Sequence, residues 1–272
     1  MLILAATPIG NLADASPRLR ELLVGASHIA AEDTRNLTKL AGLLGIKLHA
    51  KLYSLHEHNE SERLSQLLQI ATTEDVVVVS DAGMPTVSDP GFLLVRAAVE
   101  AGIDVSVVPG PSAVISALAV SGLPTDRFTF EGFLPRKDGE RRSAFEALAG
   151  ESRTMVFFES PHRILDSLKV AAEVFGTDRR ASVSRELTKK FEHTERGTLA
   201  DLIAWAQGEP KGEMVLVMAG AQKTARDMDE LVLDVLKMQS TGVRLKDAVS
   251  EIASLNSVSK SELYQRALDA RD

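Results

Sequence analysis

The run Val76–Val79, followed at once by Ser80 and Asp81, is the stretch that most constrains how this chain can fold. β-branched residues without polar alternation favour a strand that is buried on both faces, as in the middle of a parallel sheet. In open α/β sheets, ligands bind at the carboxyl ends of the strands, where the loops converge. The sequence therefore predicts an α/β fold with Asp81 at its functional edge.

Other predicted strands in the first half end in residues of the same kind. Glycine, proline, acidic, histidine or serine residues follow the predicted strands at 1–6, 28–31, 51–54 and 103–108. The segments between strands have the spacing of short amphipathic helices, with helices expected over 62–70, 92–101 and 113–120. This alternation predicts a βαβ array whose loops meet at one edge.

The second half predicts a mixed sheet. Strands are expected over 128–132, 154–158, 180–184, 192–196 and 213–219, and helices over 139–148, 161–175 and 199–206. The strands at 180–184 and 192–196 are too close for a helical crossover, so they must pair as an antiparallel hairpin. Ser160 and Pro161 are typical of a helix start. Two α/β halves that face each other leave a cleft between them.

The strand pattern ends near residue 221. Residues Leu245, Ala248, Val249, Ile252 and Ala253 have helical spacing, and Ser259 with Glu262 forms the pattern of a capping box. Two helices joined by a turn at 256–259 predict a helix-turn-helix-like unit. We therefore expect an N-terminal α/β domain at 1–113, a second α/β domain at 114–220 and a helical domain at 221–272.

Composition excludes several classes of protein. The chain has 272 residues, no cysteine and a formal net charge of −7, which exclude disulfides and thiolate catalysis and argue against sequence-independent binding to bare nucleic acid. No apolar run reaches the roughly 20 residues that span a membrane. A reducing cytoplasm is the expected compartment.

Common nucleotide and hydrolase motifs are missing from the sequence. The chain has no G-x-G-x-x-G after its first strand, no P-loop and no G-x-S-x-G elbow. His56 and His58 have a spacing that metal sites use, but on a polar loop such a pair is more often solvated. We expect no metal site.

Six segments of the first half together resemble the tetrapyrrole methylase superfamily. They are ATPIGNL at 6–12, AEDTR at 31–35, SLHEHNE at 54–60, VSDAGMP at 79–85, SDPG at 88–91 and PGPS at 109–112. The segments EGFLP at 131–135, FESPHR at 158–163, RELTK at 185–189 and RGTL at 196–199 continue the match. Within the superfamily, the chain is similar to the branch that methylates small-subunit ribosomal RNA, including its C-terminal helices.

The resemblance implies an S-adenosylmethionine-dependent enzyme that methylates a cytidine ribose 2′-oxygen in the decoding region of small-subunit ribosomal RNA. It implies a homodimer with the cofactor in the cleft between the α/β halves. By the same resemblance, the cofactor-binding residues would be Pro8, Asp81, Gly83, Met84, Ser112, Ala113, Phe158 and Gly212. Met84 departs from the family pattern, which has a small hydroxyl residue at this position.

The ribose hydroxyl must lose a proton, and several side chains at strand ends can accept one. Four candidates stay open and unranked at this stage, namely Glu32, His56, Glu159 and Glu186. Clustered cations favour contacts to phosphates somewhat over the alternative, a solvated charge run. The expected substrate-binding residues are Arg35, Arg136, Lys137, Arg141, Arg142 and Arg163.

Two other functions remain open from the sequence. The same scaffold also serves methyltransferases of small tetrapyrroles such as corrin precursors, because fold does not settle substrate. A protein that binds RNA without catalysis is the other alternative. The basic loop at 136–142 and the extra C-terminal helices favour RNA, and the acidic net charge favours the assembled small ribosomal subunit as the substrate.

Overall fold

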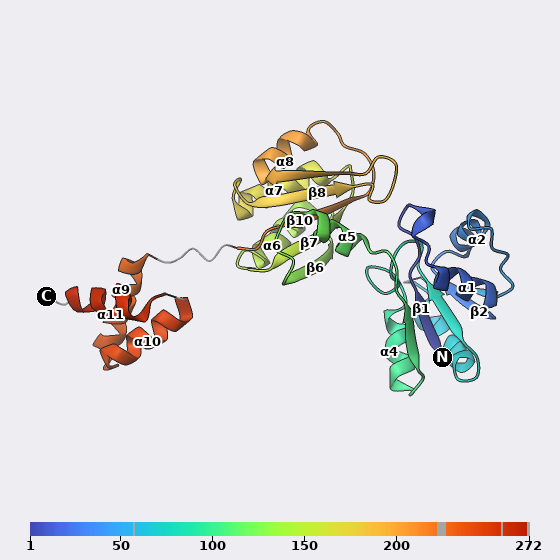
Figure 1. Ribbon diagram of the computed structural model, residues 1–272, viewed down its shortest axis with the longest axis horizontal. Coiled ribbons are helices and arrows are strands. Elements are labelled where there is room, and N and C mark those ends of the chain that lie inside the picture. Colours follow the sequence, from blue (N-terminus) through green and yellow to red (C-terminus); the bar gives the residue numbers. More distant parts are fainter. Residues whose placement is uncertain (57, 222–226, 257, 271–272) are drawn as a thin grey trace. The chain divides into compact units, whose positions relative to one another are not determined.

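The computed structural model describes residues 1–56, 58–221, 227–256 and 258–270. The chain divides into two compact units, Met1–Gly220 and Ala221–Asp272, and each is considered by itself (Figure 1). In the described parts of the chain, no helix is both long enough and apolar enough to cross a membrane.

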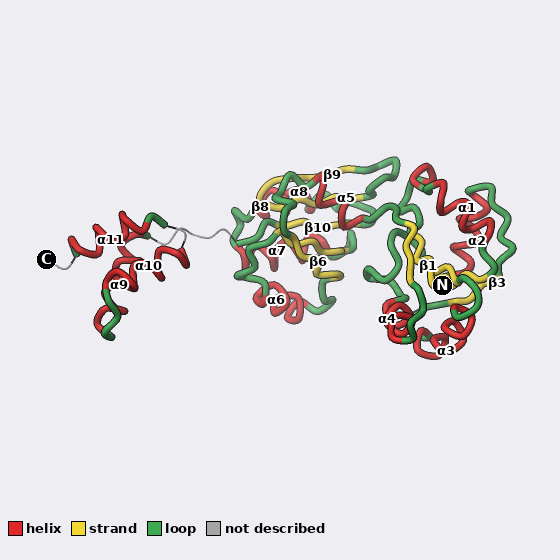
Figure 2. Tube along the Cα trace, turned by 60° about the horizontal axis from the view of Figure 1, so that its bottom comes forward, coloured by secondary structure: helices red, strands yellow, loops and turns green. Residues whose placement is uncertain are grey.

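The first sheet is entirely parallel, as the valine run predicts. Figure 2 shows its strands in yellow among the red helices of the first half. Its strand order is β3(Lys51–Ser54), β2(His28–Ala31), β4(Val76–Val79), β1(Leu2–Ala5) and β5(Val105–Val108). The valine strand β4 lies in the centre, paired with β2 on one side and β1 on the other. Its four residues are buried, which confirms the interpretation of the valine run.

Helices cover both faces of this sheet. Val77 and Val79 pack in a core with leucines of α1(Pro17–Gly25) and α2(Thr34–Leu43). Val76 and Val78 pack on the opposite face with α3(Glu60–Ala71) and α4(Phe92–Glu100). A short 3-10 helix at Leu12–Asp14 precedes α1. Because helices occupy both faces, only the ends of the strands are open to a ligand.

The second sheet is mixed, as expected. Its strand order is β6(Phe128–Phe133), β7(Thr154–Glu159), β10(Met214–Met218), β8(Arg180–Arg185) and β9(His193–Thr198). β6 and β7 are parallel, whereas β10 runs antiparallel to both β7 and β8. β8 and β9 form the predicted antiparallel hairpin, although β9 begins one residue later and ends two residues later than expected.

The second sheet also has helices on both faces. The helices α6(Asp138–Ala147), α7(Ile164–Phe175) and α8(Leu199–Ala206) contribute to the core on one face. On the other face, Val114, Ala117 and Leu118 of α5(Ala113–Val120) pack against valines of β7 and β10. The expected start of α7 at Pro161 is wrong: residues 161–163 form a turn, and the helix begins at Ile164.

The described residues of the C-terminal unit form a bundle of three helices, α9(Met228–Ser240), α10(Leu245–Asn256) and α11(Lys260–Asp269). The predicted inward residues of α10, including Val249 and Ile252, form a core with Leu231 and Leu263. Ser259 caps α11 as expected, since its hydroxyl accepts a hydrogen bond from the Glu262 amide. Ser257 of the predicted turn lies outside the described residues. α9 was not anticipated from the sequence.

Candidate functional site

The loop after β4 joins the loop after β1 through a pair of backbone hydrogen bonds. The amide of Thr7 donates to the carbonyl of Gly83 at 2.9 Å, and the amide of Gly83 donates to the carbonyl of Thr7 at 3.1 Å. Gly83 has a φ of +83°, which favours glycine, and a Cβ there would lie 3.4 Å from the Ile9 side chain. The carboxyl ends of β1 and β4 are thus tied together, as the sequence predicts for neighbouring strands.

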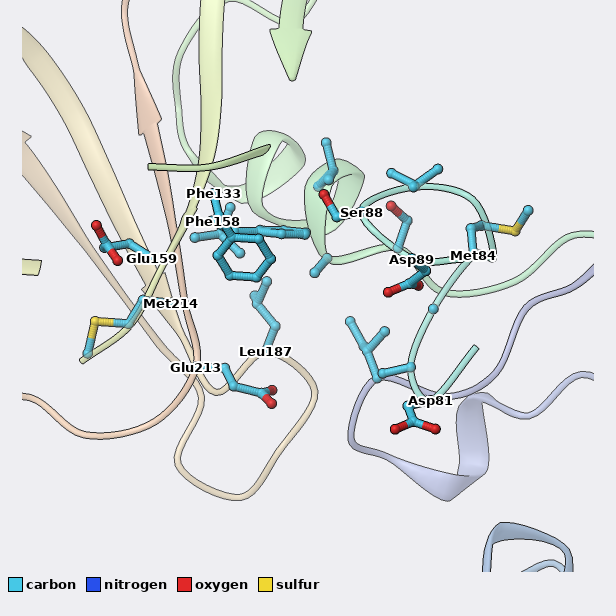
Figure 3. Close-up of a pocket in the computed structure, with 18 of the residues that line it drawn as sticks. Asp81, Met84, Ser88, Asp89, Phe133, Phe158, Glu159, Leu187, Glu213 and Met214 are labelled. Atoms are coloured by element: carbon cyan, nitrogen blue, oxygen red, sulfur yellow. The ribbon is translucent and has the colours of Figure 1, made fainter. Parts of the chain in front are cut away.

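A cavity of about 440 Å³ lies where the loops of the first sheet face strand ends of the second (Figure 3). In Figure 3, Asp81, Met84, Ser88 and Asp89 lie on one side of it, and Phe133, Phe158, Leu187 and Glu213 on the other. Six of the eight predicted cofactor residues line this cavity, namely Asp81, Gly83, Met84, Ser112, Ala113 and Phe158.

The other two predicted cofactor residues lie beside the cavity and do not line it. Pro8 is buried, and its neighbour Ile9 provides the lining surface. Gly212 has a φ of +98° and packs against the side chain of Glu186, which leaves no room for a Cβ. Its neighbour Glu213 faces the cavity instead.

Three carboxylates from two loops form an acidic cluster at one end of the cavity: Glu32 follows β2, whereas Asp81 and Asp89 both lie in the loop between β4 and α4. Glu32 Oε2 accepts a hydrogen bond from the Asp81 amide at 3.1 Å. Asp81 in turn accepts one from Asn36 Nδ2 at 2.7 Å and one from the Asp33 amide at 3.3 Å. Asp81 therefore reaches both the cavity and the start of α2.

The carboxyl of Asp89 has a raised pKa. Burial raises the pKa of its carboxyl to about 6; a hydrogen bond with Ser80 opposes the shift, and the charges of Glu32 and Asp81 add to it. A like-charged neighbourhood disfavours the ionised form of a carboxyl group. Asp89 was not among the predicted site residues, although the SDPG segment that carries it was. The missing signal was its proximity to Glu32 and Asp81, which no local pattern contains.

The loop that carries Asp89 is held in an uncommon backbone conformation. Thr86 and Ser88 both have positive φ, at 76° and 61°, which costs free energy for residues other than glycine. The far end of the loop is fixed by Glu60, whose Oε1 accepts hydrogen bonds from the amides of Gly91 at 3.1 Å and Leu94 at 3.0 Å. Gly91 has no side chain to cap α4, so the buried Glu60 of α3 caps it from outside.

The opposite wall is aromatic. Phe158 near the end of β7 packs edge-on against Phe130 at 4.9 Å and against Phe133 at 5.2 Å, measured between ring centroids. Phe158 is half-buried, whereas Phe133 is 65% exposed. This wall offers flat apolar surface to a ring-bearing ligand.

Glu159, one of the candidate proton acceptors, already accepts several hydrogen bonds from the protein itself. Its side chain is fully buried, and Arg163 pairs with it at 2.7 Å. Ser167 Oγ donates to Glu159 Oε2 at 2.6 Å, and the Ser160 amide donates to Oε1 at 2.7 Å. Arg163 also donates to the carbonyl of Leu134 at 2.7 Å. Arg163 therefore has a structural partner, and so does Glu159.

Two further candidates for the proton acceptor do not line the cavity. Glu186 pairs with Lys189 at 3.1 Å, and the hydrogen bond from Lys189 lowers the pKa of its carboxyl. His56 is exposed, with its ring 6.1 Å from that of His58. Glu57 of the same segment lies outside the described residues. Among the residues that the structure describes, no cluster of three acidic or histidine side chains could hold a metal ion.

The predicted substrate cations occupy very different surroundings. Arg136 and Lys137 are exposed, with Lys137 paired to Glu140 at 2.8 Å, and Arg142 pairs with Glu173. Arg141 is only 2% exposed and donates to the carbonyls of Pro135 and Arg136. A buried guanidinium cannot meet a phosphate, so a phosphate contact is the wrong role for Arg141.

Arg35 is a surface cation at the edge of the first sheet. Its guanidinium is bidentate on Asp33, with a shortest N–O distance of 2.6 Å, and this pairing lowers the pKa of Asp33 to about 2. The Arg35 side chain is almost fully exposed and lies on a hollow separate from the main cavity.

Comparison with known proteins identifies close relatives. Residues 1–203 match the family model described as Tetrapyrrole (Corrin/Porphyrin) Methylases. The chain is 46% identical over 272 residues to a protein named Ribosomal RNA small subunit methyltransferase I from Mycobacterium tuberculosis (strain CDC 1551 / Oshkosh), covering 99% of this chain and 95% of that one. A protein of the same name from Escherichia coli O157:H7 is 42% identical, with 98% and 94% covered.

A solved structure shares the fold at much lower identity. The methyltransferase CobJ superposes with a TM-score of 0.60 at 19% identity, covering 81% of this chain and 94% of CobJ. At this identity the likeness concerns the fold alone. It agrees with the predicted architecture of paired α/β halves.

Proposed function

The chain belongs to the tetrapyrrole methylase family, and from this membership we propose that it methylates a cytidine ribose 2′-oxygen of small-subunit ribosomal RNA. The observation that carries the proposal is the match to relatives named for small-subunit ribosomal RNA, which runs through the C-terminal helices as well as both α/β halves. The methyltransferase CobJ shares the fold, and fold alone does not determine substrate.

The lining of the cavity suits S-adenosylmethionine, the methyl donor of the family. This cofactor carries two cationic groups, a sulfonium and an ammonium, and the acidic cluster lies at one end of the cavity. Its carboxylate needs donors, and the amino end of α5 at Ser112 and Ala113 presents backbone amides next to the cavity. Phe158 offers a face or edge for the adenine ring.

We assign the cofactor contacts to the lining residues Asp81, Gly83, Met84, Ser112, Ala113 and Phe158, and we add Asp89. Pro8 and Gly212 support the walls through their neighbours Ile9 and Glu213. Asp89 joins the set because burial and the charges of Glu32 and Asp81 raise the pKa of its carboxyl, and a bound cation would favour its ionised form.

Of the four candidates for the proton acceptor, the geometry favours Glu32. Glu32 lines the cavity beside Asp81, whereas Glu186 and His56 do not line it. Glu159 lines the cavity but is bound to Arg163 and Ser167. The bound cofactor supplies a methyl group activated on sulfur, and the chain must align the hydroxyl with it and accept the proton.

The partner surfaces are part of the same proposal. The edge strand β5 and the adjacent α4 expose Val107, Phe92 and Val99, an apolar surface of the kind that a second copy of the chain would cover in a homodimer. The exposed cations Arg136, Lys137 and Arg142 are the ones we assign to RNA phosphates. Since the net charge is −7, we propose the assembled subunit in the cytoplasm as substrate.

Transfer of a labelled methyl group tests the function directly. The purified protein is incubated with labelled S-adenosylmethionine in three separate reactions, which contain small ribosomal subunits, protein-free ribosomal RNA or a corrin precursor. We expect label in the subunit RNA, and nucleoside analysis should identify it as 2′-O-methylcytidine. Label in the corrin precursor would establish a small-molecule enzyme, and subunit binding without transfer would establish a non-catalytic RNA-binding protein.

A further inference from the structure

Phe133 is an apolar side chain that the fold directs outward at the rim of the cavity. It is the last residue of β6, where the register with β7 shifts between Phe130 and Phe133. Gly132, just before it, has a φ of +71°, a backbone conformation that favours glycine at the shift. The result is a phenylalanine that is 65% exposed and yet lines the cavity.

The Phe133 ring is supported from behind. It packs edge-on against Phe158, which in turn packs edge-on against Phe130. An ideal Cβ built on Gly132 would lie 3.8 Å from Ser88 Oγ, so the bulge approaches the loop that carries Asp89. Figure 3 shows Phe133 above Phe158, with Ser88 facing them across the opening. The ring is therefore a fixed surface at the opening, with open space over it.

The position of the Phe133 ring at the rim of the cavity limits which part of a bound nucleotide can contact it. The base of a nucleotide is attached to C1′, next to the C2′ that bears the reacting hydroxyl. A nucleotide whose 2′-oxygen enters the cavity must therefore leave its base at the rim. Bases that are lifted out of a single-stranded RNA segment are commonly stacked on aromatic side chains.

We propose that Phe133 is the platform on which the base of the target nucleotide stacks while its 2′-hydroxyl enters the cavity. This inference rests on the proposed function, because it takes RNA as the substrate. Phe158 has the deeper position and serves the cofactor, whereas Phe133 has the outer position and serves the nucleotide. Stacking on one ring accounts for roughly ten- to a hundredfold in affinity.

Steady-state kinetics with small ribosomal subunits tests the platform. The variants are Phe133→Ala, Phe133→Leu and Phe133→Trp. Leucine retains apolar bulk without an aromatic face, and tryptophan retains the face. We expect the KM for subunits to rise roughly ten- to a hundredfold in Phe133→Ala and Phe133→Leu, and to stay near the parent value in Phe133→Trp. The affinity for S-adenosylmethionine, measured by calorimetry, should stay within about twofold.

Phe191 supplies the matched control, because it is 64% exposed and lies outside the cavity lining. Phe191→Ala should leave the KM for subunits unchanged. An unchanged KM in Phe133→Ala would overturn the inference. Weaker binding of S-adenosylmethionine by Phe133→Ala would also overturn it, because the ring would then belong to the cofactor site. If the parent is a dimer and light scattering shows Phe133→Ala as a monomer, the ring belongs to the dimer interface and the inference is likewise overturned. If the parent itself fails to methylate subunits, the proposed function fails and the platform fails with it.

Discussion

The two walls of the cavity hold their carboxylates in opposite ways. On the wall from the second half, Glu159 ends a strand and is bonded to Arg163, Ser167 and a backbone amide. On the wall from the first half, Asp89 lies on a loop, and the charged groups that face it are the carboxylates of Glu32 and Asp81. Glu159 is thus paired with a cation of the protein, whereas Asp89 lies close to two other carboxylates.

This difference indicates which wall is structural and which binds a ligand. A buried carboxylate that already has a guanidinium partner stabilises the fold only while both partners are present. A carboxylate with a raised pKa among other acids gains from a cation that arrives with the ligand. Substitutions on the two walls test this contrast, beginning with the largest expected effect.

Arg163→Ala should cause the largest loss of stability. It leaves the fully buried Glu159 carboxylate without its guanidinium, a change that typically costs about 3–5 kcal/mol in the free energy of unfolding. Urea denaturation of the variant measures it. Arg142→Ala is the control, since Arg142 and Glu173 form a solvent-exposed pair and their separation should leave stability unchanged. Equal stability of the two variants would mean that Glu159 is not structurally dependent on its partner.

Asp89→Asn should weaken binding of S-adenosylmethionine by about 1.5–3 kcal/mol, the range for a hydrogen bond to a charged group. Calorimetry measures the change. In the parent, affinity should fall as the pH drops below about 6, because Asp89 takes up a proton there and no longer favours a cation. Affinity of Asp89→Asn should lack this dependence, whereas a parent affinity that is flat between pH 5 and 7 would remove Asp89 from the site.

The same carboxyl has the opposite influence on the stability of the ligand-free protein. Its pKa is raised from 3.8 to about 6, so the folded state binds more protons than the unfolded state between these values. Its contribution to the free energy of unfolding therefore decreases as pH rises through this window and stays low above it. Asp89→Asn should remove that decrease, which thermal unfolding at pH 4 and pH 8 can show.

Glu60→Ala should lower the free energy of unfolding by about 1–2 kcal/mol, because α4 loses the acceptor that caps its amides. Affinity for S-adenosylmethionine should fall with it, since the loop bearing Asp89 ends at this cap. Glu60→Gln keeps an acceptor oxygen and should retain most of both quantities. Glu62→Ala, at an exposed site in the same first turn, is the control. Parent-like cofactor affinity in Glu60→Ala would show that the cap does not position the loop.

The smallest effect is expected at the exposed cations of the second half. Combined replacement of Arg136, Lys137 and Arg142 by alanine should weaken subunit binding and reduce the slope of its salt dependence by about one for each phosphate that is no longer bound. Affinity for S-adenosylmethionine should not change. Arg141 is left out because it holds the preceding turn. An unchanged salt slope would show that these cations form a solvated surface. The C-terminal helices would then be the candidates for binding the ribosomal RNA.

Much of the fold is predictable because it depends on residues close together in sequence. The valine run determines a strand with two buried faces, and the short spacing between 184 and 192 determines a hairpin. The helix α9 could also have been found, because Leu231, Val232 and Val235 repeat at helical spacing. The start of α7 could not be predicted in this way. The turn at 161–163 is accompanied by contacts of Arg163 with Glu159 and with the carbonyl of Leu134, and Leu134 is distant in sequence.

The burial of Arg141 has a signal in the sequence. Arg141 lies four residues before Phe145, so both residues are on the same face of α6, and Phe145 is part of the core. The periodicity of the helix thus indicated burial, although the run of cations around it suggested a uniform basic surface.

The sequence by itself determined the family, the two kinds of sheet and the side chains at the ends of the strands, because each depends on a local pattern. Only the tertiary structure decided which acids act together. Glu32 follows β2, whereas Asp81 and Asp89 lie in the loop after β4, and the proton affinity of Asp89 depends on its burial and on the charges facing it. Those quantities sum over neighbours in space, so residues distant in the chain determine them, and no local pattern contains them.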